Sequence, residues 1–309
     1  MAGREARGRQ FMKVGVLILP DRSWPANRER WRRAEEMGFF CGWTYDHIFW
    51  RTMAEQPWFS ATPVLTAAAA ATSQLRIGLM VGSPNFRHPV TLVKDSLALD
   101  DISGGRFVLG VGAGAVSAGD AEVLGGPILD KYDRAERFAE FVQLSSELLD
   151  NRTLTKRGRF FSAQDARMIP GSTQAPRLPL AVAASGRKGI DLAAHYGDAW
   201  ITAGPANWLG NTSAAASLEL ITRQRQLLDE RLEEHGRTST SFRKVVIATP
   251  AVGNPLESVD TCRRLLDTYS QIGFDEFVLH WPQENGIYAG KQAVLEDIAA
   301  AVLPDYQKD

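Results

Sequence analysis

The feature that most restricts the fold is a strand–helix–strand pattern in residues 75–114. A short apolar run, Arg76–Val81, is followed by a polar loop that ends at Pro89, a residue tolerated in the first turn of a helix. Apolar side chains then recur at helical spacing, glycines end that stretch, and a second apolar run, Phe107–Val111, follows. Because two parallel strands need such a crossover, the segment predicts one β/α unit of a parallel sheet.

The same unit occurs eight times along the chain. Most of the expected strands are continuous apolar runs, which is typical of strands covered on both faces. Eight alternations predict a closed (β/α)8 TIM barrel of the α/β class. A doubly wound open sheet is the alternative, but the glycine-rich motif that would follow its first strand is absent. The expected strands are Val14–Leu19, Phe40–Tyr45, Arg76–Val81, Phe107–Val111, Leu180–Ala183, Ala199–Thr202, Val245–Ala248 and Glu276–His280, and the expected helices are Asn27–Met37, Ser60–Ser73, Val90–Ile102, Arg134–Leu149, Gly189–His195, Ser213–His235, Glu257–Ile272 and Gln292–Val302.

One segment, Asn151–Arg177, interrupts the alternation with glycines, prolines and charges but no clear period. A connection of this length inside a compact domain is usually functional or mobile. We therefore expect an insertion before the fifth strand that could act as a lid, with a plain surface loop as the alternative. No second domain is indicated, so residues 1–309 are expected to form a single domain. Residues 1–11 carry three arginines and no apolar core, and we interpret them as a loose basic arm.

The amino-acid composition argues against several classes of function for this chain. Lys and Arg number 35 against 36 Asp and Glu, and the resulting net charge of −1 argues against a nucleic-acid partner. No apolar run approaches the roughly 20 residues of a membrane span. The two cysteines, Cys41 and Cys262, have no metal-ligand spacing and form no disulfide framework. We expect a cytoplasmic protein without a metal that acts on a small molecule.

The carboxyl ends of barrel strands are where function is expected. The second strand ends in Tyr45-Asp46-His47-Ile48-Phe49-Trp50, which places a carboxylate, an imidazole and an indole together. Imidazole is the side chain best suited to proton transfer near neutral pH. We predict that His47, Asp46 and Trp50 belong to the catalytic site, and the alternative is a helix cap beside a structural histidine.

The third and eighth strands add candidates for the wall of the site. Asn85 could face the pocket, whereas Arg87 and His88 stand at a helix start and are expected to anchor their loop. After the eighth strand, His280 and Trp281 form a second imidazole–indole pair that could line the mouth. For Trp281, core packing is the alternative interpretation. We expect Trp50, Asn85, His280 and Trp281 to contact substrate.

The fourth and fifth strands end in segments suited to a cofactor. Gly112-Ala113-Gly114 offers small residues that would let a flat ligand approach the backbone. Ala184-Ser185-Gly186-Arg187-Lys188 precedes a helix and combines a hydroxyl with two cations. Backbone N–H groups at a helix start and cationic side chains both favour a phosphate. The sequence therefore predicts a phosphorylated cofactor across these two loops.

With these pieces in place, nearly the whole chain, from Met12 to about Pro304, resembles the luciferase-like flavin and deazaflavin oxidoreductases. The resemblance implies a (β/α)8 barrel with an insertion after the fourth helix, and commonly a homodimer. It rests on five segments, which are Ser83–Pro89, Leu99–Phe107, Gly110–Gly114, Ala183–Gly186 and Ala193–Trp200.

Within that family, Asp46-His47 with Trp50 resembles the branch that uses the deazaflavin coenzyme F420. The resemblance implies that Asp46 and His47 contact the deazaflavin and that His47 and Trp50 are catalytic. It also implies a non-prolyl cis peptide at Met80–Val81, forming a bulge behind the tricyclic ring.

By the same resemblance, Gly112–Gly114 would hold the edge of the ring and Ala184–Lys188 its phosphate. One position departs from the family. The sugar-phosphate dehydrogenase of this branch has a glutamate as general acid where this chain has Ala115, so a different substrate is expected. Asp120 and Glu122 lie nearby in the sequence, but the sequence does not place them in the pocket.

The sequence thus favours an F420-dependent oxidoreductase that transfers a hydride between C5 of the deazaflavin and a small organic substrate. The reaction would reduce a C=C or C=N bond or oxidise an alcohol, with His47 moving a proton at the neighbouring heteroatom. An FMN-dependent monooxygenase supplied by a partner reductase is the alternative, and a non-catalytic flavin-binding protein is a lesser one. A partner enzyme that reduces F420 or flavin would serve either reaction.

Overall fold

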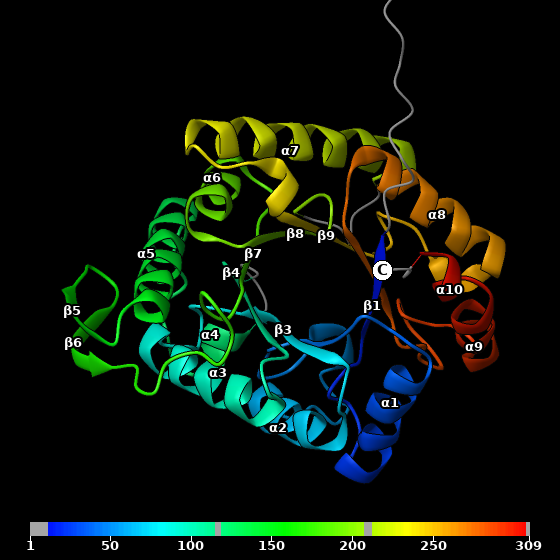
Figure 1. The fold of residues 1–309 in the computed structure, drawn as a ribbon, viewed down its shortest axis with the longest axis horizontal. Helices are drawn as coiled ribbons and strands as arrows, with labels where there is room; N and C mark the ends of the chain where they lie inside the picture. The colour runs from blue at the N-terminus through cyan, green and yellow to red at the C-terminus, as the bar shows by residue number, and fades with distance from the viewer. Residues whose placement is uncertain (1–11, 115–118, 207–211, 307–309) are drawn as a thin grey trace, which may run out of the picture.

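In the computed structural model, eight parallel strands close into a barrel, as the alternation in the sequence predicts (Figure 1). The structure describes residues 12–114, 119–206 and 212–306, so the predicted basic arm and Ala115 lie outside the described residues. The strands run around the barrel in the order β1-β10-β9-β8-β7-β4-β3-β2. They are β1 (Lys13–Leu17), β2 (Cys41–Thr44), β3 (Arg76–Gly82), β4 (Phe107–Gly112), β7 (Leu180–Ala183), β8 (Ala199–Thr202), β9 (Arg243–Ile247) and β10 (Glu276–His280).

A ring of helices covers the outside of the barrel (Figure 1). Their ends follow local chemistry: in α3, Pro89 opens the helix, the His88 Nδ1 atom accepts the Val90 N–H, and Gly104 at φ 65° ends it. The helices are α1 (Trp24–Glu36), α2 (Ala61–Ala71), α3 (Pro89–Ser103), α5 (Lys131–Asp150), α6 (Arg187–Tyr196), α7 (Ala214–Glu234), α8 (Val259–Ile272) and α9 (Gln292–Ala301), with short helices α4 (Asp120–Val123), α10 (Leu303–Tyr306), η1 (Arg51–Met53), η2 (Ser239–Ser241) and η3 (Pro255–Glu257). None of the described helices is both long enough and apolar enough to cross a bilayer.

The eight barrel strands are buried between two separate apolar cores, one under the helices and one inside the barrel. In β10, for example, Phe277 and Leu279 pack outward under the helices, whereas Val278 packs inside the barrel. Successive residues of a strand point to opposite sides, so a strand between two cores must be apolar at nearly every position. This explains why the expected strands read as continuous apolar runs.

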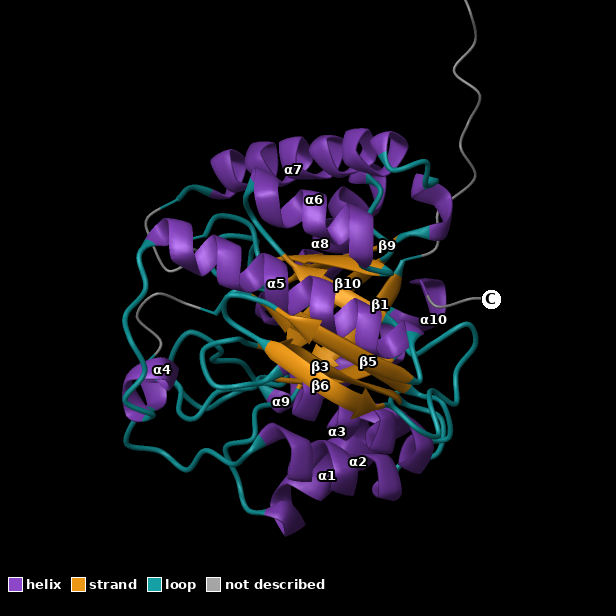
Figure 2. Cartoon of the chain, turned by 90° about the vertical axis from the view of Figure 1, so that its left-hand side faces the viewer, coloured by secondary structure: helices purple, strands orange, loops and turns teal. Residues whose placement is uncertain are grey.

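The insertion contains a two-stranded antiparallel hairpin, β5 (Thr153–Arg157) and β6 (Ser162–Arg167), where the sequence indicated no regular structure. It lies outside the ring of helices, beside α5 (Figures 1 and 2). The Glu140 carboxylate on α5 accepts the backbone N–H groups of the hairpin turn, including that of Phe161 at 2.6 Å. Farther along, Asp100 on α3 accepts the backbone N–H of Thr173 at 2.7 Å. These contacts place the insertion on the outer side of the barrel, and its action as a lid stays a prediction.

Candidate functional site

The loops that follow β2, β3, β4 and β7 lie side by side, because these four strands are consecutive neighbours in the barrel. Parallel strands bring their carboxyl ends to one rim. The segments in which the sequence indicated a site therefore meet at the same end of the barrel. α4, which follows β4, projects from that end (Figures 1 and 2).

His47 is held by a carboxylate that the sequence analysis could not place. The His47 Nδ1 atom lies 2.7 Å from Oδ2 of Asp120, which opens α4. The other oxygen of Asp120 accepts the backbone N–H of Ile48 at 2.8 Å, so both oxygens are engaged. Asp120 is fully buried, whereas the His47 side chain is 12% exposed. The structure therefore makes Asp120 the positioning partner of His47.

This contact also defines which nitrogen of His47 can take part in proton transfer. An ionised carboxylate only accepts hydrogen bonds, so Nδ1 of His47 carries the proton and Nε2 keeps the lone pair in the neutral ring. Within the described part of the chain, Nε2 makes no hydrogen bond. The pair is thus arranged like other carboxylate–imidazole pairs that serve as a general base.

Asp46 forms a buried ion pair with Arg87, and its expected contact with a deazaflavin stays a prediction. It is 1% exposed, and its two oxygens accept hydrogen bonds from Arg87, from Nε at 2.9 Å and from Nη2 at 2.7 Å. Burial raises the pKa of the Asp46 carboxyl, while the Arg87 guanidinium opposes that change. Asp46 therefore anchors the loop between β3 and α3 through Arg87. The expectation that Arg87 and His88 stabilise this loop is confirmed.

An aromatic wall stands next to His47. The Trp50 ring stacks on Tyr45, with centroids 5.2 Å apart, and on Trp58 at 6.2 Å. The centroids of the Trp50 and His47 rings are 4.9 Å apart. Trp58 Nε1 donates to the His47 backbone carbonyl at 3.0 Å, which ties the wall to the imidazole. Trp50 thus lies where the sequence placed it, beside His47.

His280 contacts Tyr45, one of the residues of this aromatic wall. Its Nε2 atom lies 2.8 Å from the Tyr45 hydroxyl, and its ring stacks on Tyr288 with centroids 4.0 Å apart. The residue is only 4% exposed. Burial lowers the pKa of His280 to about 3, and a hydrogen bond with the Ala248 backbone only partly offsets this. His280 is therefore held neutral in the barrel interior, in contact with Tyr45, and its expected contact with substrate stays a prediction.

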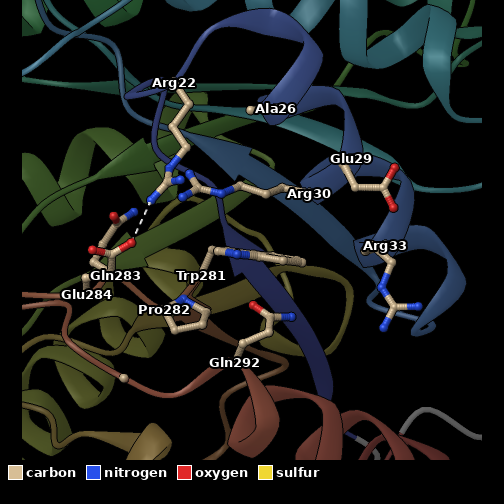
Figure 3. Close-up of a pocket in the computed structure, with 11 residues that line it drawn as sticks. Arg22, Ala26, Glu29, Arg30, Arg33, Trp281, Pro282, Gln283, Glu284 and Gln292 are labelled. Atoms are coloured by element: carbon tan, nitrogen blue, oxygen red, sulfur yellow. Dashed lines mark ion pairs between the residues drawn. The ribbon is translucent and has the colours of Figure 1, made fainter.

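Trp281 is not brought to this cluster. It packs in the outer core and lines a cavity of about 430 Å³ between α1 and the loop after β10 (Figure 3). Arg22 and Arg30 approach the same cavity from the side of α1 (Figure 3). The packing of Trp281 in the core agrees with the alternative interpretation, and its expected contact with substrate stays a prediction.

The carboxyl ends of β3 and β4 pack tightly against each other. The Met80–Val81 peptide is cis, as the family resemblance implies, and both side chains face the barrel interior. A Cβ added at Gly112 would lie 2.5 Å from Val81 Cγ2, and one at Gly114, which has φ 72°, would lie 2.5 Å from Nδ2 of Asn85. These two glycines are thus required by the packing of β3 and its loop. Their expected role was the approach of a flat ligand, and that role stays a prediction.

The start of α6 is open and suited to an anion. Gly186 caps the helix without a side-chain hydrogen bond, and a Cβ added there would meet nothing within 4 Å. Gly186, Arg187 and Lys188 are exposed. The Ser185 carbonyl accepts from Gln224 Nε2 at 2.9 Å, which positions the loop from α7. Lys188 Nζ lies 3.8 Å from Glu136 Oε1 on α5. The N–H groups of the helix start and the two exposed cations fit a phosphate group.

The fold and the rim together define a (β/α)8 protein with an imidazole held by a carboxylate, an aromatic wall beside it and an open helix start at the end of β7. Residues 12–299 match the family model of luciferase-like monooxygenases, and the chain belongs to this family.

Two curated relatives represent its different chemistries. The chain is 32% identical over 208 residues to 4-hydroxyprotoasukamycin monooxygenase of Streptomyces nodosus subsp. asukaensis, covering 66% of this chain and 52% of that protein. It is 37% identical over 171 residues to the F420-dependent glucose-6-phosphate dehydrogenase of Beutenbergia cavernae, covering 54% and 49%. The matching segments thus span about half of each relative. By their names, one of these relatives is a monooxygenase and the other is a dehydrogenase.

The solved structures agree on the fold. The F420-dependent tetrahydromethanopterin reductase of Methanopyrus kandleri superposes with a TM-score of 0.76 at 18% identity, covering 96% of this chain and all of that one. At this identity the likeness establishes the barrel and its connections only.

Proposed function

We propose that the protein is an F420-dependent oxidoreductase. The observation that carries the proposal is the His47–Asp120 pair, with its Nδ1–Oδ2 distance of 2.7 Å, at the catalytic rim of a luciferase-like barrel. A relative that is 37% identical over 171 residues uses F420 on glucose 6-phosphate, which supports the choice of coenzyme. Because Ala115 stands where that branch has its acid, we propose a different substrate.

The residues at the rim fit a deazaflavin. The backbone N–H groups at Arg187 and Lys188 would hold its phosphate, since this helix start is open and cationic. The bulge at Met80–Val81 would support the ring, and Trp50 would bound the substrate side. The coenzyme, when bound, supplies a carbon that donates or accepts a hydride.

The residues of the chain itself would carry out the proton transfer that accompanies the hydride transfer. In alcohol oxidation, His47 Nε2 would take the hydroxyl proton as the substrate carbon loses its hydride. In reduction of a C=C or C=N bond, the imidazolium would return a proton to the atom next to the carbon that receives the hydride. Asp120 keeps Nδ1 protonated and stabilises the imidazolium, so the same nitrogen acts in both directions.

An FMN-dependent monooxygenase remains the second candidate. It is favoured by the 32% identity to 4-hydroxyprotoasukamycin monooxygenase over 208 residues. The open start of α6 would accept the phosphate of either molecule. The two candidates differ in which cofactor the protein should bind more tightly and in whether turnover requires O2.

The test compares the two cofactors directly. Purified protein is titrated with F420 and, separately, with FMN while cofactor fluorescence is followed, and tighter binding of F420 is expected. Turnover is then measured as the change in deazaflavin absorbance with activated alkenes, imines and secondary alcohols. His47→Gln should retain cofactor affinity and lose about 10²–10⁴-fold in turnover.

The chain supplies a matched control. His235 also pairs with a carboxylate, with Nε2 3.1 Å from Asp191 Oδ1, but it lies on the outer helices. His235→Gln should leave both affinity and turnover unchanged. Tighter binding of FMN, with O2-dependent product formation, would replace the first candidate by the second. Unchanged turnover in His47→Gln would remove the proton role.

A further inference from the structure

The cavity between α1 and the loop after β10 is large enough for a small molecule (Figure 3). Its volume of about 430 Å³ falls within the range of roughly 300–1,000 Å³ that is typical of small-molecule pockets. Its lining residues belong to α1 and the residues just before it, to the loop after β10 and to the start of α9. Within the described residues, neither His47 nor the start of α6 lines it, so the cavity is separate from the proposed active site.

One wall of this cavity is formed by Gln283, whose side-chain amide is buried. The residue is 8% exposed, and its Nε2 atom makes no hydrogen bond within the part of the chain that the structure describes. Its backbone is fixed, because its N–H donates to the Tyr288 carbonyl at 2.9 Å and its carbonyl accepts the Gly290 N–H at 3.0 Å. A half-turn of the amide exchanges its oxygen and nitrogen, so the group can present an N–H to the cavity. A ligand atom that accepts this hydrogen bond would remove the cost of an unpaired donor.

Arg22 is the most exposed of the three arginines that line the cavity. Its side chain is 45% exposed and makes no hydrogen bond within the described residues. Its Nη2 atom lies 3.6 Å from Oε1 of Glu284, which is an ion pair longer than a hydrogen bond, and the Glu284 side chain is 85% exposed. Exposed ion pairs contribute little to stability. A ligand anion can therefore replace Glu284 beside Arg22 at little cost.

The other two arginines of the cavity have carboxylates beside them. Arg30 Nη1 donates to Asp21 Oδ1 at 2.7 Å, and Arg33 Nη2 donates to Glu296 Oε1 at 3.0 Å. Burial lowers the pKa of Arg30, Asp21 opposes this change, and repulsion from Arg22 adds to the lowering. The guanidinium groups of Arg22 and Arg30 are thus close neighbours, as Figure 3 shows. Their shared end of the cavity carries one cation more than its buried carboxylate neutralises.

The remaining lining residues restrict the kind of anion. Trp281 and Pro282 are buried and form an apolar surface below the two guanidinium groups (Figure 3). Glu29 lies at the far end of the cavity, on the side of Arg33 (Figure 3). A phosphate dianion would be repelled by this carboxylate and by Glu284 twice as strongly as a single charge. The cavity therefore favours a carboxylate attached to an apolar body.

We propose that this cavity is a further binding site, for a small organic acid. Its carboxylate would take the place of Glu284 beside Arg22, where a guanidinium fork can donate two parallel hydrogen bonds. Arg30 and Gln283 would add further hydrogen bonds, and the apolar body would lie against Trp281. None of the residues assigned to hydride or proton transfer takes part, so the site is independent of the proposed function.

The first experiment tests the chemistry of the ligand. Isothermal titration calorimetry on the wild type, without cofactor, uses benzoate as the probe and benzamide and acetate as comparisons. Benzoate is expected to bind with a millimolar Kd. Benzamide lacks the charge and acetate lacks the ring, so each should bind at least about tenfold more weakly. Inorganic phosphate should not displace benzoate at the same concentration.

The second experiment locates the site with variants. Arg22→Gln removes the exposed guanidinium and should weaken benzoate binding at least about tenfold. Glu284→Gln removes the competing carboxylate and should strengthen benzoate binding about threefold. As the matched control, Arg28→Gln removes the same charge from an exposed position of α1 outside the cavity and should bind benzoate as the wild type does.

Several results would overturn the site. These are no benzoate binding by the wild type, equally tight binding of benzamide, or equal benzoate binding by Arg22→Gln. A loss of benzoate binding in Lys188→Gln instead would place the probe at the start of α6 and would overturn it as well.

Two measures keep this test independent of folding and of the proposed function. Circular dichroism compares the folded content of each variant. If Arg22→Gln does not fold, Arg22→Lys keeps the charge but loses the planar fork, and benzoate binding should still weaken. The titrations contain no F420, so failure of F420 to bind the protein counts against the proposed function alone.

Discussion

Acid should destabilise this protein through His280, a histidine that the fold holds neutral. Burial lowers the pKa of His280 to about 3, from 6.5 in an exposed ring. Below pH 6.5 the unfolded chain binds a proton at this ring and the folded chain does not. The contribution of His280 to stability is therefore fully present above pH 6.5 and is lost as the pH falls toward about 3.

The size of this effect follows from the two pKa values. Each pH unit between them costs about 1.4 kcal/mol of the free energy of unfolding. Allowing for partial protonation near pH 6.5, the loss from His280 between pH 7.5 and pH 5.0 is about 2 kcal/mol. A pKa of 4 in the folded state would give nearly the same value, because pH 5.0 still lies above it.

The assay is urea unfolding at pH 7.5 and pH 5.0, followed by tryptophan fluorescence, for the wild type and His280→Gln. Glutamine can still accept a hydrogen bond from Tyr45 but does not titrate. The wild type should lose about 2 kcal/mol more than the variant between the two pH values. Other titrating groups cancel in this comparison. Equal losses would mean that His280 is protonated or exposed in the folded protein.

The contacts of Asp46, Gly112 and His47 predict the outcomes of three further substitutions. Arg87→Ala leaves the buried carboxylate of Asp46 without its partner and should lower the free energy of unfolding by about 3 kcal/mol, measured by urea unfolding. Gly112→Ala brings a Cβ to 2.5 Å from Val81 Cγ2 and should cost about 1–3 kcal/mol in the same assay, whereas no loss would show that β3 can shift. Asp120→Asn should lower kcat at least about 10²-fold and change the pH–rate profile while cofactor affinity stays the same. A purely structural role for this carboxylate would lower affinity and stability without moving that profile.

The barrel could be predicted from the sequence because its cause is local and repeated. A strand such as Phe107–Gly112 is buried on both faces and must therefore lack polar side chains throughout. This pattern can be recognised in the sequence without knowing which strands and helices pack against it. The hairpin of Thr153–Arg157 and Ser162–Arg167 gave a weaker signal. Its strands are short and largely exposed, so few of their residues had to be apolar.

The site was predicted less completely, and the reason is geometric. Neighbouring residues of an extended segment point to opposite sides. Asp46 therefore pairs with Arg87, while His47 pairs with Asp120. The partner of His47 is 73 positions away, and only the path of the loop after β4 brings it there.

The same rule separates the predicted pair at the end of β10. His280 enters the barrel interior and lies against Tyr45. Trp281, the next residue, packs outward in the core beneath the helices. Adjacency in the sequence suggested a shared surface, whereas alternation along an extended chain excludes it.

The central claim is that the loops after β2 and β7 bind two ends of one deazaflavin. A crystal structure of the protein with F420 tests it most directly. The claim predicts phosphate density at the backbone N–H groups of Gly186, Arg187 and Lys188, with the ring between the Met80–Val81 bulge and His47. A phosphate bound elsewhere, or a ring that leaves His47 facing solvent, would contradict it.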